Sequence, residues 1–153
     1  MPVKPIPEGY HSVTPYIVVN GASKCIDFLK RAFDGKETIC HSKPDGTVGH
    51  AEVRIGDSAV MLGEACGEWK AMPCAIYLYV PDTDAVYKQA LKAGATSIME
   101  PANQFYGDRN AGVKDPCGNL WWIATRVENV SPEEMKRRAQ AHMKPAAAQP
   151  SHA

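Results

Sequence analysis

Apolar and polar residues alternate in short runs along the chain, and the order of these runs predicts one structural unit present twice. Residues 14–19 (TPYIVV) have the pattern of a strand, and residues 75–80 (AIYLYV) repeat it 61 positions later. After the first of these strands, residues 22–33 place Ile26 and Leu29 on one face of an amphipathic helix. Further short alternating runs follow each strand and helix. The pattern therefore predicts two βαβββ modules.

The remaining elements keep this order in both copies. We expect strands at 37–42, 48–55 and 58–63 in the first copy, and a helix at 83–93 with strands at 96–100, 107–114 and 120–126 in the second. Asn20 and Asp82 are suited to cap the two helices. The spacing holds without a gap, because Val53–Leu62 falls on Lys114–Ile123 at the same offset. The predicted fold is α+β, with the two modules forming curved mixed sheets around a cavity.

The boundaries of these units follow from changes in composition along the chain. We expect a lead-in at 1–11, a first module at 12–63, a linker at 64–73, a second module at 74–128, a helix at 129–143 and a disordered tail at 144–153. Ser131, Pro132 and Glu134 form a capping box that starts the C-terminal helix.

Composition and charge narrow the class of protein. The 153 residues include 17 basic and 17 acidic side chains, so no strong field would attract nucleic acid or a membrane surface. No apolar run is long enough for a membrane span, and the N-terminal residues lack a secretory pattern. The five cysteines are odd in number and form no CxxC pair, which is typical of reduced thiols. We therefore expect a cytoplasmic protein.

Several segments of the chain resemble the PhnB-like, glyoxalase-related subgroup of the vicinal oxygen chelate superfamily, which includes glyoxalase I, extradiol dioxygenases and bleomycin-resistance proteins. These segments are residues 13–33, 44–62, 104–109, 115–128 and 131–138. The resemblance implies a fold of the glyoxalase/bleomycin-resistance type and a homodimer whose cavity is formed by curved eight-stranded sheets. The resemblance indicates the fold much more strongly than it indicates an activity.

The resemblance also implies four positions for metal ligands on the first and last strands of each module. In this sequence they are Thr14, Met61, Ala75 and Trp122. None of these side chains offers the imidazole nitrogen or carboxylate oxygen that a divalent metal needs. We therefore predict no metal at this site, and no cofactor.

Strand alternation predicts which side chains face the cavity. Tyr16, Tyr77, Tyr79 and Trp122 fall on that face, and Tyr106 lies in the run that leads to the next strand. These rings could simply fill the space as a small apolar core. Alternatively, they could form a pocket for a small organic molecule that is aromatic or anionic.

A second group of candidate residues carries acid–base chemistry. His50 and Glu52 lie two apart on one strand face, where they could act as a base and its orienting partner, ligate a displaced metal, or form a structural pair. Arg109 overlies Val48 at the repeat offset, which predicts that it also faces the cavity and that Asp108 faces away. Its partner would be Glu52, a ligand anion, or an acid elsewhere in the chain.

Two functions remain in view. The first is a small-molecule-binding protein of the glyoxalase/bleomycin-resistance type that lacks the usual metal site. The alternative is a lyase, isomerase or dioxygenase-like enzyme with an atypical site at His50, Glu52 and Arg109. The sequence leaves open whether the chain catalyses any reaction.

Overall fold

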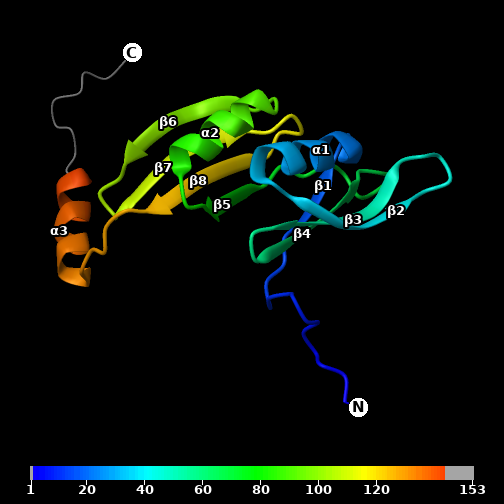
Figure 1. The fold of residues 1–153 in the computed structure, drawn as a ribbon, viewed down its shortest axis with the longest axis horizontal. Helices are drawn as coiled ribbons and strands as arrows, with labels where there is room; N and C mark the ends of the chain where they lie inside the picture. Colours follow the sequence, from blue (N-terminus) through cyan, green and yellow to red (C-terminus); the bar gives the residue numbers. More distant parts are fainter. Residues whose placement is uncertain (1, 144–153) are drawn as a thin grey trace.

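The computed structural model describes residues 2–143 and contains the two predicted βαβββ modules, followed by a helix (Figure 1). The first module consists of β1 (Tyr16–Val19), α1 (Ala22–Phe33), β2 (Lys36–Ser42), β3 (Val48–Ile55) and β4 (Ser58–Glu64). The second consists of β5 (Ala75–Tyr79), α2 (Thr83–Lys92), β6 (Thr96–Asn103), β7 (Asp108–Lys114) and β8 (Leu120–Arg126), and α3 (Pro132–His142) follows it. The α+β class is confirmed. The predicted disordered tail, 144–153, lies outside the described residues.

Each module folds into one four-stranded mixed sheet. The strand orders are β1-β4-β3-β2 and β5-β8-β7-β6, so the two modules have the same topology. β1 is parallel to β4, and β5 is parallel to β8, whereas the other pairs are antiparallel. Tyr16 pairs with Met61, and Tyr77 pairs with Trp122 at the equivalent position.

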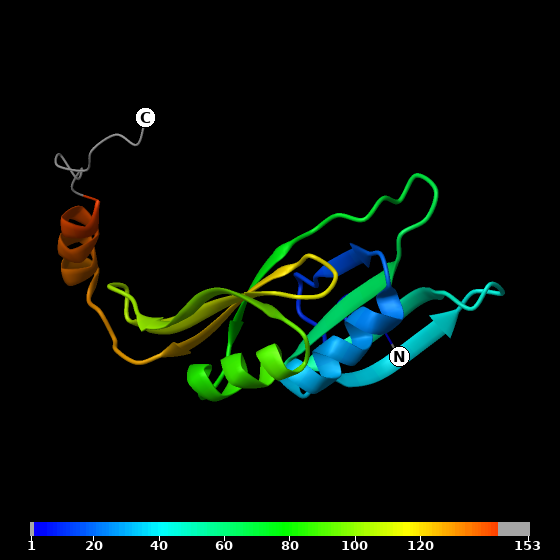
Figure 2. The same cartoon turned by 90° about the horizontal axis from the view of Figure 1, so that it is seen from above.

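The core lies between the sheets and their helices. Alternate residues of β1, such as Ile17 and Val19, are buried beneath α1. α1 and α2 also pack against each other, and the rings of Phe33 and Trp121 meet with 4.8 Å between their centroids. The two modules therefore lie side by side along the molecule, with their helices adjacent (Figure 2). No strand of one sheet pairs with a strand of the other within residues 2–143.

The helix caps agree with the sequence at two of three positions. Asp82 caps α2 by accepting a hydrogen bond from the amide of Ala85, and Ser131 caps α3. Asn20, in contrast, does not cap α1. The N-cap is Gly21, in the left-handed region at φ 87°, and the Glu64 carboxylate accepts its amide hydrogen at 2.7 Å. The carboxylate of Glu64, far from Gly21 in the sequence, thus takes the place of the side-chain cap expected from Asn20.

The repeat is not free of gaps, and this corrects the expected register. Ile55 pairs with Ser58 across the first turn, whereas the Asp115 amide donates to the Asn119 carbonyl across the second, which holds one residue more. Residues of β7 are therefore shifted by one position relative to β3, and a shift of one reverses the face of every side chain. Asp108 consequently faces away from α2, and Arg109 faces toward it.

The longer turn is built around the carboxylate of Asp115. This side chain accepts hydrogen bonds from the amides of Cys117 and Asn119 and from the indole nitrogen of Trp121, at 2.8–2.9 Å. This one carboxylate therefore holds residues 115–119 in a turn. Within residues 2–143, none of the helices combines the length and apolarity needed to span a bilayer.

Candidate functional site

Each sheet has one face that its helix does not cover, and we call these the first and second open faces. The predicted aromatic residues lie on them as alternation requires. Tyr16 is 53% exposed, Tyr77 41% and Tyr79 57%, whereas Ile17, on the covered face of β1, is 1% exposed. The three tyrosines therefore lie on the open faces, and their contact with a ligand stays a prediction.

A buried carboxylate organises the second open face. Asp108 is only 2% exposed, and its Oδ2 accepts hydrogen bonds from Tyr77 at 2.7 Å and from Tyr79 at 2.9 Å. The two phenol rings lie 5.2 Å apart between centroids. Both phenolic hydrogens are thus committed to one acceptor, which fixes the direction in which the rings point.

Asn110 extends this arrangement to a third phenol. Its amide nitrogen donates to the hydroxyl of Tyr77 at 3.1 Å and to that of Tyr106 at 2.7 Å. Its carbonyl oxygen accepts from Gln104 at 3.1 Å. Asn110 therefore uses every hydrogen-bonding group it has. Within residues 2–143 the hydroxyl of Tyr106 donates no hydrogen bond, so its hydrogen is available to a ligand.

Trp122 forms the apolar wall of the same region. A Cβ atom at Gly112, its cross-strand neighbour, would lie 2.6 Å from Cζ3 of the indole, so the ring lies directly against the glycine backbone. The resulting pocket has a volume of about 340 Å³. It is lined by Tyr77, Met99, Gln104, Tyr106, Asn110 and Trp122. Four residues of this cluster, Asp108, Asn110, Gln104 and Met99, were not predicted from the sequence.

The protonation of the phenols follows from their surroundings. Burial raises the pKa of Tyr77 well above its ordinary value, and the hydrogen bond to Asp108 adds to the increase. The hydrogen bond to Asp108 raises the pKa of Tyr79 as well. Both residues are therefore neutral hydrogen-bond donors near pH 7, and neither is suited to act as a base.

The other oxygen of Asp108 is incompletely satisfied. Oδ1 is buried and accepts no hydrogen bond within residues 2–143. The guanidinium of Arg126 lies 3.5 Å away and supplies a positive charge without hydrogen-bonding geometry. Arg126 itself donates to the carbonyl of Tyr106 at 2.7 Å. Asp108 therefore accepts two hydrogen bonds at Oδ2 but has only an electrostatic contact, with Arg126, at Oδ1.

The first open face carries His50 and Glu52, which face the same way as predicted. His50 Nε2 lies 3.9 Å from Glu52 Oε1, and His50 Nδ1 lies 3.5 Å from the hydroxyl of Tyr16. Glu52 is 3% exposed, and its Oε2 accepts a 2.7 Å hydrogen bond from Tyr10. The N-terminal lead-in therefore covers part of this face, which the sequence did not predict.

Arg109 does not join His50 and Glu52, so its expected orientation is wrong. It faces α2, where Nε and Nη2 each donate to the Asp84 carboxylate at 2.9 Å, and Nη1 donates to Asn103 at 3.2 Å. The extra residue of the second turn causes this reversal. The third of the three partners considered, an acid elsewhere in the chain, is the one observed.

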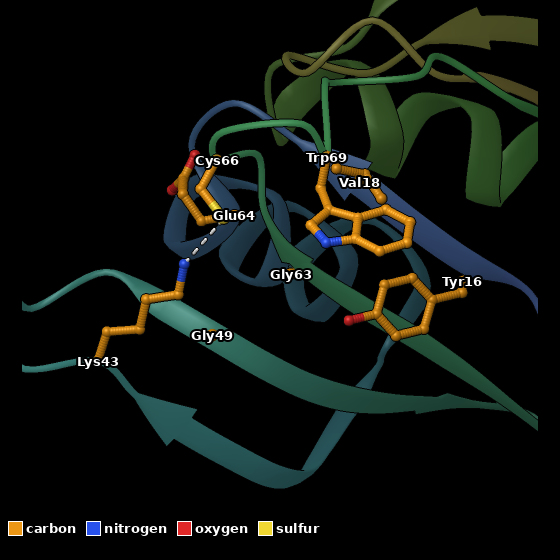
Figure 3. A pocket seen from close by; sticks show the side chains of 8 residues that line it. All are labelled: Tyr16, Val18, Lys43, Gly49, Gly63, Glu64, Cys66 and Trp69. Atoms are coloured by element: carbon orange, nitrogen blue, oxygen red, sulfur yellow. Dashed lines mark hydrogen bonds between the residues drawn. The ribbon is translucent and has the colours of Figure 1, made fainter.

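A further pocket, of about 320 Å³, lies beyond Tyr16 on the first module (Figure 3). Tyr16, Gly63 and Trp69 are among its lining residues, and Lys43 donates to the sulfur of Cys66 at 3.3 Å. Tyr16 therefore lines this pocket and not the pocket of the second open face. It lies apart from Tyr77, Tyr106 and Trp122, with which the sequence had grouped it.

The four positions implied for metal ligands are occupied by a threonine, a methionine, an alanine and a tryptophan. This donor set does not fit a divalent metal, which prefers nitrogen or carboxylate oxygen. Within residues 2–143, no three histidine, cysteine, aspartate or glutamate side chains are grouped so that they could hold a metal ion.

Comparison with known proteins places the chain in a family. The family model described as the Glyoxalase/Bleomycin resistance protein/Dioxygenase superfamily matches residues 9–123. An uncharacterized protein of Mycobacterium bovis is 36% identical over 137 residues, which cover 82% of this chain and 90% of that protein.

Solved structures agree on the fold. The structure of TioX from Micromonospora sp. ML1 is similar with a TM-score of 0.67 at 20% identity, covering 76% of this chain and 99% of that one. A glyoxalase/bleomycin resistance protein/dioxygenase family enzyme from Burkholderia phytofirmans matches with a TM-score of 0.62 at 18% identity, covering 74% and 97%. From the family match and the paired βαβββ modules together, we conclude that this chain belongs to the glyoxalase/bleomycin resistance protein/dioxygenase superfamily.

Proposed function

We propose that this protein binds a small organic molecule on the second open face without a metal ion. One observation carries the proposal. Asp108 and Asn110 hold three phenols in fixed positions, and two of them, those of Tyr77 and Tyr106, line a pocket of about 340 Å³ together with Trp122. A cluster that only filled space would not need a buried, partly unsatisfied carboxylate, because such a group is costly.

The lining indicates the chemistry of the ligand. Trp122, Met99 and the tyrosine rings offer a flat apolar surface, and the hydroxyl of Tyr106 offers one hydrogen bond. Among residues 2–143, no lysine or arginine lines this pocket. Of the aromatic and anionic ligands expected from the sequence, an aromatic molecule with a hydrogen-bond acceptor is therefore favoured.

We extend the proposal to assembly and location. The open faces expose Tyr16, Tyr77 and Tyr79, and a second copy of the chain would cover such surfaces in a homodimer. The five cysteines are all free, which fits a cytoplasmic protein. The resemblance of residues 13–33, 44–62, 104–109, 115–128 and 131–138 supports assignment to the PhnB-like subgroup. Gel filtration with light scattering tests the dimer directly.

Binding can be tested with two substitutions and a matched control. Trp122→Ala removes the apolar wall, and Tyr106→Phe removes the free hydroxyl, so both should weaken a ligand found by screening. Trp69→Ala removes another tryptophan, 66% exposed and outside the pocket, and should leave affinity unchanged. Equal affinity in all four proteins would refute binding on this face.

A second candidate is acid–base catalysis by a lyase or isomerase on the first open face. The observation that favours it is the buried Glu52 carboxylate 3.9 Å from His50, an arrangement in which an acid orients a base. Arg109 takes no part in this catalytic site, because it is paired with Asp84 on the other module. If it is correct, His50→Gln should abolish turnover and leave ligand affinity intact.

A further inference from the structure

We infer that the pocket between the N-terminal lead-in and the first open face binds the cationic group of an organic ammonium compound, with Glu52 as its counter-ion. The site is separate from the pocket of the second open face and does not depend on the function proposed there. Its volume is about 500 Å³. The lead-in supplies one wall of the pocket, and β2, β3 and β4 supply the other.

The inference begins with the charge of Glu52. Its side chain is 4% exposed, and its Oε2 accepts the hydrogen bond from Tyr10. Its Oε1 accepts no hydrogen bond from any described residue, and its only ion-pairing contact in that part of the chain is His50 Nε2 at 3.9 Å. A buried carboxylate is costly unless a cation or several donors compensate it. Glu52 therefore has one oxygen available to a positively charged group.

Arg54, the arginine nearest to Glu52 along β3, does not compensate the charge of Glu52. Arg54 shares the open face with Glu52, but its Nη2 donates to the carbonyl of Gly9 at 2.8 Å and its Nη1 to that of Asp57 at 3.3 Å. Its guanidinium lies 6.0 Å from the centre of the Tyr10 ring. Arg54 thus fastens the lead-in over the face, and none of the described lysines and arginines lines the pocket itself.

The remaining walls decide what kind of cation would fit. Apolar side chains come from Ile6 and Pro7 of the lead-in and from Ile39 and Met61 of the sheet, while His11, His41 and His50 contribute imidazole rings. An inorganic ion would find too few ligands, since no suitable group of three donors exists in the described residues. An ammonium group on an apolar or aromatic body satisfies both the carboxylate and the apolar walls. An anion would instead be repelled by the carboxylate of Glu52.

Three probes of the same shape and different charge test the inference: benzylammonium, benzyl alcohol and benzoate. Each is titrated into the full chain, and binding is followed by NMR chemical-shift changes at His50 and Met61. We expect benzylammonium to bind more tightly than the other two. Glu52→Gln should weaken it by about tenfold or more, because a charge-assisted hydrogen bond is lost, and should leave benzyl alcohol unchanged.

Glu100→Gln is the matched control, because it removes the same charge from an exposed position on the other sheet. Benzoate or benzyl alcohol binding as tightly as benzylammonium would overturn the inference, and so would an unchanged affinity in Glu52→Gln. If Glu52→Gln does not fold, the ranking of the probes on the unaltered protein still decides. Shifts confined to the Trp122 indole would also overturn it, because they would place the cation in the other pocket.

Discussion

Tyr77 donates its phenolic hydrogen to Oδ2 of Asp108 at 2.7 Å, and this bond reaches across the sheet from β5 to β7. The strand between them, β8, carries Trp122 directly beside Tyr77. One buried acid thereby fixes the position of a ring two strands away, next to the wall of the pocket. The order of the second open face depends on this contact.

Replacing Asp108 by asparagine should therefore disturb both stability and the phenols. The variant leaves Tyr77 and Tyr79 with a weaker acceptor, so we expect a loss of about 1–3 kcal/mol in the free energy of unfolding, measured with urea. Removing the carboxylate should also lower the pKa of Tyr79, since the hydrogen bond to Asp108 is the main cause of its increase. Ultraviolet titration of the phenols measures this change.

Asp27→Asn is the control for that substitution. Asp27 forms an exposed ion pair with Arg31 at 3.0 Å, and such pairs contribute little. A loss of stability in Asp27→Asn as large as that in Asp108→Asn would show that the hydrogen bonds of Asp108 contribute no more to stability than an exposed ion pair does.

Gly112→Ala should displace the indole of Trp122. The new methyl group would lie 2.6 Å from the ring, so either the ring or the strand must move. We expect a cost of about 1–3 kcal/mol and altered tryptophan fluorescence. Combining it with Trp122→Leu should restore most of the stability lost by Gly112→Ala, because the smaller side chain leaves room. Additive losses in the double variant would contradict this packing.

The pair of Arg109 with Asp84 makes a prediction about pH. The hydrogen bond from Arg109 holds the pKa of Asp84 below its ordinary value of 3.8. Because the folded-state pKa is lowered, the pair stabilises the protein above the unfolded-state pKa and loses that effect as the pH falls through the folded-state pKa. Arg109→Met should thus be less stable than the unaltered protein at neutral pH, and the difference should vanish in strong acid. A difference that persisted there would indicate another role for Arg109.

The facing of most site residues could be predicted because strand alternation is local. Tyr77, Tyr79, His50 and Glu52 each follow from the parity of their own strand, and the structure places them accordingly. Arg109 and Asp108 were assigned by superposing one module on the other. A single extra residue in the Asp115–Asn119 turn was enough to reverse them.

Other contacts depend on residues far apart in the chain and leave no local signal. Tyr10 meets Glu52 over 42 positions, and it comes from a segment without a strand or helix pattern of its own. In the sequence, Asn110 has the pattern of an ordinary polar strand residue. In the structure it is 2% exposed and connects Tyr77 with Tyr106 through hydrogen bonds. A buried network of this kind becomes visible only when the strands are placed side by side.

The α3 helix offers an independent test of a surface network. Hydrogen bonds from Arg137 and Arg138 lower the pKa of Glu134 to about 2, and Arg138 also binds Glu128 and the carbonyl of Phe105. Arg138→Gln should therefore release the helix and speed amide exchange in α3 several-fold. Lys136→Gln, an exposed neighbour without a hydrogen bond or ion pair in the described residues, should leave exchange unchanged. Similar exchange in both variants would contradict this anchoring.

The most direct test of ligand binding on the second open face uses the three tryptophans as separate reporters. The indole of Trp122 lines the pocket, that of Trp121 is buried and bonded to Asp115, and that of Trp69 lies on the first module. We would screen planar aromatic fragments by NMR and record the three indole N–H signals. We expect fragments that shift the Trp122 signal alone and that bind less tightly to Tyr106→Phe. A screen whose hits shift only Trp69, or that yields no hit at Trp122, would contradict it.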